Sequence, residues 1–478
     1  MRLVSHKNVI KLQKSFKKVR FICIYRYFFV ILRRNYYLQK KEYYMERSIL
    51  DALKQWKSSS RRKPLILNGA RQVGKTWILK HFGATYYDNV AYLNCDHEPM
   101  AANLFEDYDT NRIIRMLEVL TRTQITAGKT LIILDELQEV SRGLHALKYF
   151  AEEAPEYHIV VAGSLLGLML HEGENFPVGK VNILQMHPMS FTEFLIAVGE
   201  SQLSNSLQKG DWQITNAMHD KINRLLRIYL YVGGMPEAVQ AYCNQVPLRE
   251  IRTIHNEILT TYINDLSKHA PKEQVIRITQ VFRSIPAQIA KENKKFIFGL
   301  LKNGARAKEY EIAIQWLLDA GIVHKVCQVS KPQAPLSFYE ESDAFKLFLL
   351  DCGLLGAMNA TDASEVTLTE KAFEEYNGAL TEQLVLQELK AVDDLPVYYY
   401  TKPNAKQEID FMIMIKNQAI PVEAKAGENL QAKSLKQYII ENSPTKAIKT
   451  SLMPFKSNEI IDNVPLYAIA SYIRLMQR

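Results

Sequence analysis

One segment governs the interpretation of this sequence, and it reads Pro64-Leu65-Ile66-Leu67-Asn68-Gly69-Ala70-Arg71-Gln72-Val73-Gly74-Lys75-Thr76. The apolar residues before Gly69 predict a short strand, and the residues from Thr76 onward predict a helix. A glycine-rich loop in this setting, ending in Gly-Lys-Thr, is typical of a phosphate-binding loop (P-loop). Its glycines let successive N–H groups face a phosphate chain, and the helix adds the positive end of its dipole. We therefore predict nucleotide binding.

The loop residues have distinct predicted roles. Lys75 is expected to reach the β- and γ-phosphates of ATP, and the Thr76 hydroxyl to bind Mg²⁺. The residues expected to contact the nucleotide are Gly69, Ala70, Arg71, Gln72, Val73, Gly74, Lys75, Thr76 and Trp77. The alternative interpretation is a glycine-rich turn that carries a surface lysine.

A second apolar run, Leu131-Ile132-Ile133-Leu134, leads into Asp135 and Glu136. A continuous apolar run predicts a strand buried on both faces of a parallel sheet, and ligands of such sheets bind at the carboxyl ends of the strands. We expect Asp135 to hold Mg²⁺ through water and Glu136 to polarise the attacking water. The alternative is an acid pair that caps the next helix.

The next predicted strand, His158–Ala162, ends near Ser164. Ser164 fits equally well as a sensor of the γ-phosphate and as the N-cap of a helix over 165–170. An arginine finger from a second copy would couple hydrolysis to self-assembly, and charge alone suggests Arg71 or Arg227.

Composition indicates a soluble protein of about three domains, because 478 residues exceed what one core supports. The net charge of +9 is concentrated in residues 1–44, which hold twelve basic residues and one acid. The remaining residues carry 48 basic and 50 acidic groups, so the charge does not indicate a nucleic-acid partner. Five scattered cysteines without a paired spacing favour a reducing cytoplasm over a disulfide framework or a zinc site.

The first 44 residues contain an apolar run, 21–32, that is interrupted by Arg26. It is too short for a membrane span, so no stable membrane insertion is expected, and no signal-peptide cleavage pattern follows it. We expect Met45 to be the physiological start and 1–44 to be a non-native or disordered basic extension. The alternative is a basic helix that lies on a membrane surface.

The rest of the chain is predicted to be an α/β protein with these parts: a P-loop ATPase domain over 45–200, its helical part over 201–270, a winged-helix-like middle over 271–350, and a smaller α/β domain over 351–478. The polar stretch 200–216 predicts a linker. Two glycines before Pro236 predict a tight turn followed by a helix. Three short helices and an extended tail are expected over 272–330, with a wing strand over 321–326. Packing without DNA contact is favoured for this middle part, because no basic face dominates.

The last part of the chain holds a second set of charged residues. Asp410, Glu423 and Lys425 form a D…E-x-K pattern on predicted strands, and Glu382 lies on the preceding helix. The carboxylates could bind a divalent cation while Lys425 orients a water for phosphodiester attack. The alternative is that the same residues only brace a nuclease-like fold.

With these segments in view, the chain resembles bacterial and archaeal AAA-type (AAA_14) P-loop ATPases that carry a C-terminal domain of unknown function, DUF4143. The matching segments are Gly69–Thr76, Leu131–Gln138, Ala162–Leu166, Phe176–Lys180, Tyr231–Val239, Thr381–Glu388, Glu408–Phe411 and Val422–Lys425. The resemblance begins near Met45. It implies ATP binding, a winged-helix middle and a restriction-endonuclease-like C-terminal domain. The family often has Gly-Arg where this chain has Gly179-Lys180, so any bidentate arginine contact there would be lost.

The sequence thus predicts a cytoplasmic, Mg²⁺-dependent ATPase that acts as a switch or motor. Self-association into a homo-oligomer and binding of nucleic acid are both compatible with this prediction. Two alternatives stay open at this point. One is an ATP-gated, metal-dependent nuclease that uses the C-terminal pattern, and the other is a scaffold that binds ATP without hydrolysing it.

Overall fold

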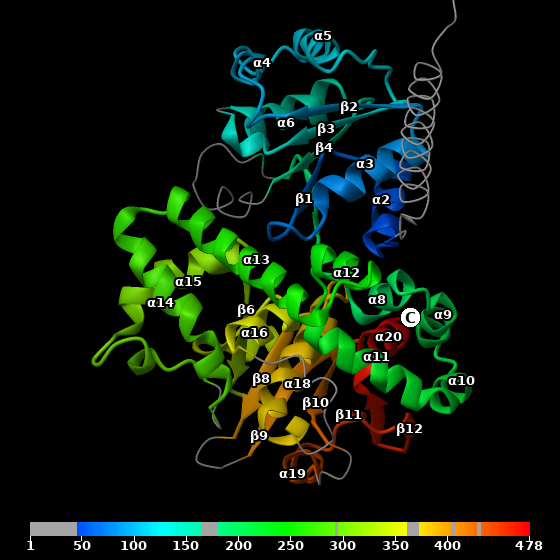
Figure 1. The fold of residues 1–478 in the computed structure, drawn as a ribbon, viewed down its shortest axis with the longest axis vertical. Coiled ribbons are helices and arrows are strands. Elements are labelled where there is room, and N and C mark those ends of the chain that lie inside the picture. Colours follow the sequence, from blue (N-terminus) through cyan, green and yellow to red (C-terminus); the bar gives the residue numbers. More distant parts are fainter. Residues whose placement is uncertain are drawn as a thin grey trace, which may run out of the picture. The chain divides into compact units, whose positions relative to one another are not determined.

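The computed structural model describes residues 45–140, 142–163, 177, 179–291, 295–360, 372–402, 407–427 and 432–478 (of 372–377, the backbone alone). Two sheets organise these residues (Figure 1). The first has five strands in the order β2-β3-β4-β1-β5, and the second has eight in the order β12-β13-β11-β10-β9-β8-β6-β7. Ser164, the helix expected over 165–170 and the extension 1–44 lie outside the described residues.

The first sheet is entirely parallel, as expected for a P-loop fold. Its strands are β1 (Leu65–Asn68), β2 (Asn89–Asn94), β3 (Thr130–Asp135), β4 (His158–Ala162) and β5 (Asn182–Gln185). The flanking helices are α2 (Ile49–Ser58), α3 (Lys75–Tyr86), α4 (Ala101–Leu104), α5 (Thr110–Thr121) and α6 (Gly143–Glu153). Every residue of β3 and β4 is buried, which explains their continuous apolar runs. β4 lies between β1, which leads into the P-loop, and β3, which leads into Glu136. One strand therefore separates the P-loop from the acid pair.

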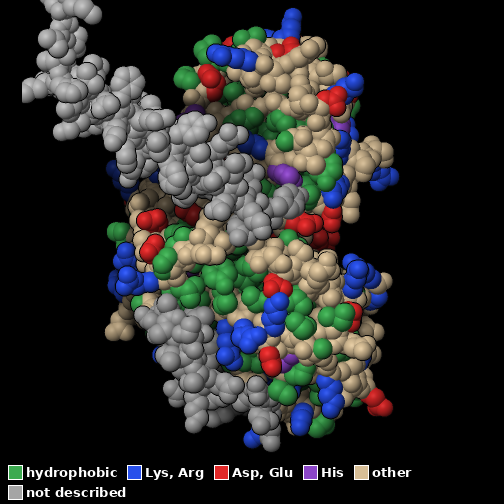
Figure 2. All heavy atoms as spheres, turned by 45° about the vertical axis from the view of Figure 1, so that its right-hand side comes forward, with side chains coloured by type: hydrophobic (Ala, Val, Ile, Leu, Met, Phe, Trp, Pro, Cys, Tyr) green, Lys and Arg blue, Asp and Glu red, His purple; other side chains and the backbone are tan. Residues whose placement is uncertain are grey.

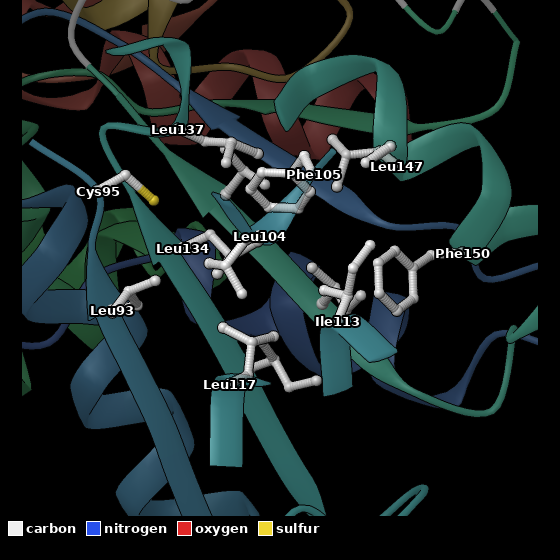
Figure 3. Close-up of a cluster of buried hydrophobic side chains, with 14 of the residues drawn as sticks. Leu93, Cys95, Leu104, Phe105, Ile113, Leu117, Leu134, Leu137, Leu147 and Phe150 are labelled. Atoms are coloured by element: carbon white, nitrogen blue, oxygen red, sulfur yellow. The ribbon is translucent and has the colours of Figure 1, made fainter. Parts of the chain in front are cut away.

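A buried cluster fixes the helices on one side of this sheet. In Figure 3, Leu93 and Leu134 from the strands meet Ile113 and Leu117 from α5 and Phe150 from α6. Among these five residues the greatest exposed fraction is 5%, so the sheet and its helices form one packed core. This core holds the carboxyl ends of the strands rigidly.

A helical region follows the first sheet. Its helices are α8 (Phe191–Ala197), α9 (Ser201–Lys209), α10 (Trp212–Ala217), α11 (His219–Val232), α12 (Pro236–Cys243) and α13 (Leu248–His269). The predicted helix start at Pro236 is confirmed. The linker predicted over 200–216 was wrong, because α9 and α10 occupy that stretch. Its polar residues lie on the outer side of α9, whereas Leu203 and Leu207, four residues apart, are buried.

Two long helices and a hairpin come next: α14 (Lys272–Ile289), α15 (Ala307–Asp319), β6 (Val323–Val329) and β7 (Glu340–Leu349). The two α-helices have 18 and 13 residues, and a 3-10 turn, Phe298–Leu300, lies between them, so the three short helices expected over 272–330 are not all short. β6 pairs with β7 and, in parallel, with β8 (Val397–Thr401). The predicted boundary between 350 and 351 therefore falls within one continuous sheet.

The remaining elements complete the second sheet and its cover. They are α16 (Cys352–Met358), α18 (Ala372–Lys390), β9 (Glu408–Ile415), β10 (Gln418–Ala424), α19 (Lys433–Asn442), β11 (Ala447–Ser451), β12 (Lys456–Ser457), β13 (Ile461–Pro465) and α20 (Ile469–Gln477). The expected order of helix, strand, hairpin and strand is present in α18, β8, β9 and β10, which form the smaller, mixed α/β part. Among the described residues, no helix has the length and apolar character needed to cross a membrane.

Candidate nucleotide site

The predicted metal-binding pair lies together at the carboxyl end of the first sheet. The Thr76 hydroxyl, at the start of α3, donates a hydrogen bond to Asp135 Oδ2 over 2.9 Å. The Tyr92 hydroxyl donates to the same oxygen over 3.0 Å. Asp135 is only 5% exposed, so these two donors hold a largely desolvated carboxylate in one orientation. Hydroxyl and carboxylate oxygens are ligands that Mg²⁺ accepts, so this donor set fits the expected ion.

Lys75 is folded back onto the loop that carries it. Its Nζ donates to the carbonyl oxygens of Gly69, over 2.7 Å, and Ala70, over 2.9 Å. Burial lowers the pKa of Lys75 to about 8, although the nearby carboxylates of Glu136 and Asp135 oppose that shift. An anionic phosphate beside the ammonium would favour its charged form, so this lysine is placed to gain from binding a polyphosphate.

The loop needs its glycines. Gly69 and Gly74 have φ angles of +148° and +97°. A Cβ on Gly69 would also lie 2.3 Å from the carbonyl oxygen of Met186, just after β5. The backbone therefore takes a conformation and an approach that a side chain at Gly69 would prevent.

Glu136 occupies the turn directly after β3. Its φ is +52°, in the left-handed region that is uncommon for residues other than glycine. Its N–H donates to the Ala162 carbonyl at the end of β4 over 2.7 Å, and Gln138 Nε2 donates to its Oε2 over 2.5 Å. These contacts hold the carboxylate beside the end of β4, close enough to Lys75 to be the largest charge that raises its pKa. A strained backbone held in this way is common at active sites.

Sequence reasoning missed Arg47, a residue 5% exposed just before α2. Its Nη1 donates to the Val73 carbonyl over 2.9 Å, and its Nη2 donates to the His187 carbonyl over 2.6 Å. Its Nε lies 3.3 Å from Glu193 Oε1, and both of those side chains are nearly fully buried. Arg47 thus braces the P-loop against α8. Only the capping box of Ser190 and Glu193 could be inferred from local sequence, because Arg47 is remote in the chain.

Other predicted residues have less defined positions. Trp77 is 46% exposed and stacks on His81, with ring centroids 5.3 Å apart. Arg71 lies in the P-loop with its side chain 44% exposed, and Arg227 lies partly buried on α11. The role of either arginine as an arginine finger in a second copy stays a prediction.

The C-terminal charged residues also come together, but around a lysine. Lys346, from β7, is 1% exposed and forms ion pairs with Glu408 and, over 3.8 Å, with Glu382. Burial alone would lower the pKa of Lys346, yet the carboxylates Glu382, Glu408 and Asp410 raise it well above its ordinary value. The ammonium therefore stays charged within a cluster that includes Glu382 and Asp410, two of the carboxylates that were expected to bind a metal ion.

The other members of the D…E-x-K pattern have protein partners. Asp410 Oδ2 accepts the Ala424 N–H over 2.8 Å, and Lys425 Nζ lies 2.6 Å from Glu423 Oε1. Burial raises the pKa of Glu423, against the effect of Lys425. Within the ranges that the structure describes, no group of three or more His, Cys, Asp or Glu side chains is arranged to hold a metal ion. Sequence reasoning missed Lys346 because its strand was assigned to a different domain.

The parallel sheet, the P-loop at the end of β1 and the acid pair at the end of β3 define a P-loop nucleotide-binding protein. The comparisons agree: the family model described as an AAA domain matches residues 61–195, and that of the domain of unknown function DUF4143 matches 377–469. These two models match the AAA-type domain and the C-terminal DUF4143 domain that the resemblance implied. A third model, the domain of unknown function DUF8612, matches residues 223–365 and was not expected.

No curated protein matches the sequence. Solved structures with partial similarity include Orc1 of Aeropyrum pernix in complex with DNA, at 12% identity and a TM-score of 0.26, covering 67% of this chain and 92% of that one. The RuvB Holliday junction branch migration motor of Thermotoga maritima has 14% identity and a TM-score of 0.27, with coverages of 60% and 88%. Cdc6p of Pyrobaculum aerophilum has 11% identity and a TM-score of 0.23, with coverages of 69% and 94%.

Proposed function

We propose that the protein is a Mg²⁺-dependent ATPase of the AAA type that works as a nucleotide-controlled switch. The observation that carries this proposal is the 2.9 Å hydrogen bond from the Thr76 hydroxyl to Asp135 Oδ2, close to the buried ammonium of Lys75. Bound Mg²⁺ would neutralise phosphate oxygens. Lys75 would exchange its two carbonyl acceptors for β- and γ-phosphate oxygens, and Glu136 would orient and polarise the attacking water.

The test measures ATP binding by calorimetry and turnover by phosphate release, both with Mg²⁺ present. K75A is expected to weaken ATP binding by about 100-fold or more, since a charge-assisted contact to the phosphates is lost. E136Q is expected to keep ATP affinity within about threefold and lose turnover by about 100-fold or more. Lys129, an exposed lysine next to β3, supplies the control K129A, which should match the wild type.

The outcomes separate the candidates. Wild-type protein without affinity for ATP would overturn the whole proposal, and so would K75A with unchanged affinity and turnover. Binding without turnover would favour the scaffold that does not hydrolyse ATP. Turnover that E136Q abolishes would exclude that scaffold.

The nuclease alternative receives no support from the geometry, because Lys346 is paired with Glu382 and Lys425 with Glu423, two carboxylates of the predicted metal site. On the face drawn in Figure 2, basic side chains are scattered among acidic and apolar ones. We therefore keep nucleic acid and a homo-oligomer as predicted partners without assigning a surface to either. The described cysteines are buried and free, which supports the cytoplasmic location that we propose.

A further inference from the structure

Helix α13 contacts the P-loop from outside the AAA domain. The Tyr262 hydroxyl donates to the backbone carbonyl of Arg71 over 2.9 Å. One turn along the same helix, Asp265 forms an ion pair with the Arg71 guanidinium. The Tyr262 side chain is 1% exposed, whereas that of Arg71 is 44% exposed. The helix therefore holds the loop by a buried backbone contact and by a charge pair that solvent can reach.

A second element from the same part of the chain lies against the start of the loop. Gly321, in the turn between α15 and β6, has a φ of +68°. A Cβ at this position would lie 3.2 Å from the backbone nitrogen of Ala70 and 3.7 Å from the carbonyl carbon of Gly69. Two segments outside the AAA domain thus touch consecutive residues of the P-loop, Gly69 to Arg71.

The charges at this contact lie in the field of the nucleotide site. Among the groups that shift the pKa of Lys75, the Arg71 guanidinium lowers it and the Asp265 carboxylate raises it. All three groups are therefore close neighbours, and Lys75 is the residue that reaches the β- and γ-phosphates in a P-loop. A carboxylate at this place repels a triphosphate and also occupies an arginine that could bind it.

We propose that Asp265 is a counter-ion that competes with the terminal phosphate of ATP for Arg71, so that triphosphate binding breaks the charge contact between α13 and the P-loop. This inference rests on the proposed nucleotide site and adds the regulation of that site. A guanidinium binds a carboxylate and a phosphate through the same charge-assisted hydrogen bonds, so one partner can replace the other. A diphosphate lacks the terminal group and would leave the pair with Asp265 intact. The switch would then report which nucleotide is bound.

The test compares ATP and ADP affinities of D265N with those of the wild type. D265N is expected to bind ATP about three- to tenfold more tightly than the wild type, because an ion pair and one repulsive charge are removed. Its affinity for ADP should stay within about twofold of the wild-type value. Glu257, an exposed acid on the same helix, provides the matched control E257Q, which should change neither affinity. In an R71A background the D265N effect on ATP should fall to within about twofold, because only the direct repulsion by Asp265 remains. R71A alone should weaken ATP binding relative to ADP binding.

Amide hydrogen exchange gives an independent readout. ATP should raise the exchange rate of the last turns of α13 in wild-type protein, whereas ADP should not. D265N should show the faster exchange even without nucleotide. The inference is overturned if D265N binds ATP no more tightly than E257Q does, or if the D265N effect is undiminished in R71A. Wild-type protein that binds no ATP would instead refute the proposed function, so the two failures are distinguishable.

Discussion

Replacing Lys346 with methionine tests whether the C-terminal charge cluster is a structural ion network. Methionine keeps an unbranched, apolar side chain of similar length and removes only the ammonium. Lys346 is 1% exposed, and its partners Glu382 and Glu408 have side chains that are 7% and 22% exposed. The substitution therefore leaves two largely buried carboxylates without their main counter-charge.

The expected cost follows from this burial. Removing one partner of a buried ion pair destabilises a protein by about 3–5 kcal/mol, because the remaining charge is uncompensated. Residues 45–478 form one compact unit, and for a unit of this size a loss of 3–5 kcal/mol lowers the melting temperature by about 3–6 °C. A buried carboxylate without a counter-charge is costly, and protonation removes that cost. The loss of stability should therefore be larger at pH 8 than at pH 5.

Melting temperatures measured by circular dichroism at pH 5 and pH 8 provide the assay, with K449M as the control. Lys449 is a partly exposed lysine on β11 of the same sheet, so K449M should shift the melting temperature by less than about 2 °C. A K346M protein that melts like K449M at pH 8, or that loses equal stability at both pH values, would refute the reasoning. Binding of Mn²⁺ to wild-type protein without nucleotide, abolished by D410N, would show that a metal ion can displace the lysine.

Three further predictions concern contacts between the helical region and its neighbours. G234A should destabilise the protein by several kcal/mol in urea unfolding, since the added Cβ would lie 2.1 Å from the carbonyl oxygen of Met189; wild-type stability would contradict it. Burial raises the pKa of Glu388 to about 7, so stability should fall by roughly 3 kcal/mol as the pH rises from 5 to 9, and E388Q should remove that dependence. Burial raises the pKa of Glu193, but Arg47 and hydrogen-bond donors outweigh this effect and bring the pKa below its ordinary value. The stability that the pair of Arg47 and Glu193 supplies should therefore be lost as the pH falls below about 4. R47M should lower the melting temperature already at pH 7.

Much of the first sheet was predictable because its information is local. Runs such as Leu131–Leu134 are apolar throughout only because both faces of the strand are buried, and the P-loop supplies its own turn and helix start. β5 was not foreseen, because only alternate residues of Asn182–Gln185 are partly buried and the strand is short. The α9–α10 stretch was taken for a linker, because polar residues on the outer side of short helices hide the few buried leucines.

In the candidate site, too, some contacts could be predicted from the sequence and others could not. The proximity of Thr76 and Asp135 follows from a general property of parallel sheets, whose loops at the carboxyl ends of the strands meet at one edge. Tyr92, Arg47 and Lys346 could not be found from local pattern, because their partners lie tens to more than a hundred residues away. No periodicity or short motif records such a pairing. A buried lysine or arginine is recognisable only once the fold shows that water is excluded from it.

Two arginine–carboxylate pairs connect the P-loop to other parts of the chain, and the burial of each pair decides what it can do. Arg47 is 5% exposed and paired with an equally buried Glu193, so breaking that pair would cost about 3–5 kcal/mol. The pair of Arg71 and Asp265 is solvent-accessible on the arginine side, and pairs of this kind contribute about 0–1 kcal/mol. A nucleotide can readily offset the second cost, whereas offsetting the first would use up much of a micromolar binding energy of about 8 kcal/mol. The loop is therefore fixed on the side of α2 and α8 and exchangeable on the side of α13, and the signal of bound triphosphate should leave the AAA domain through α13.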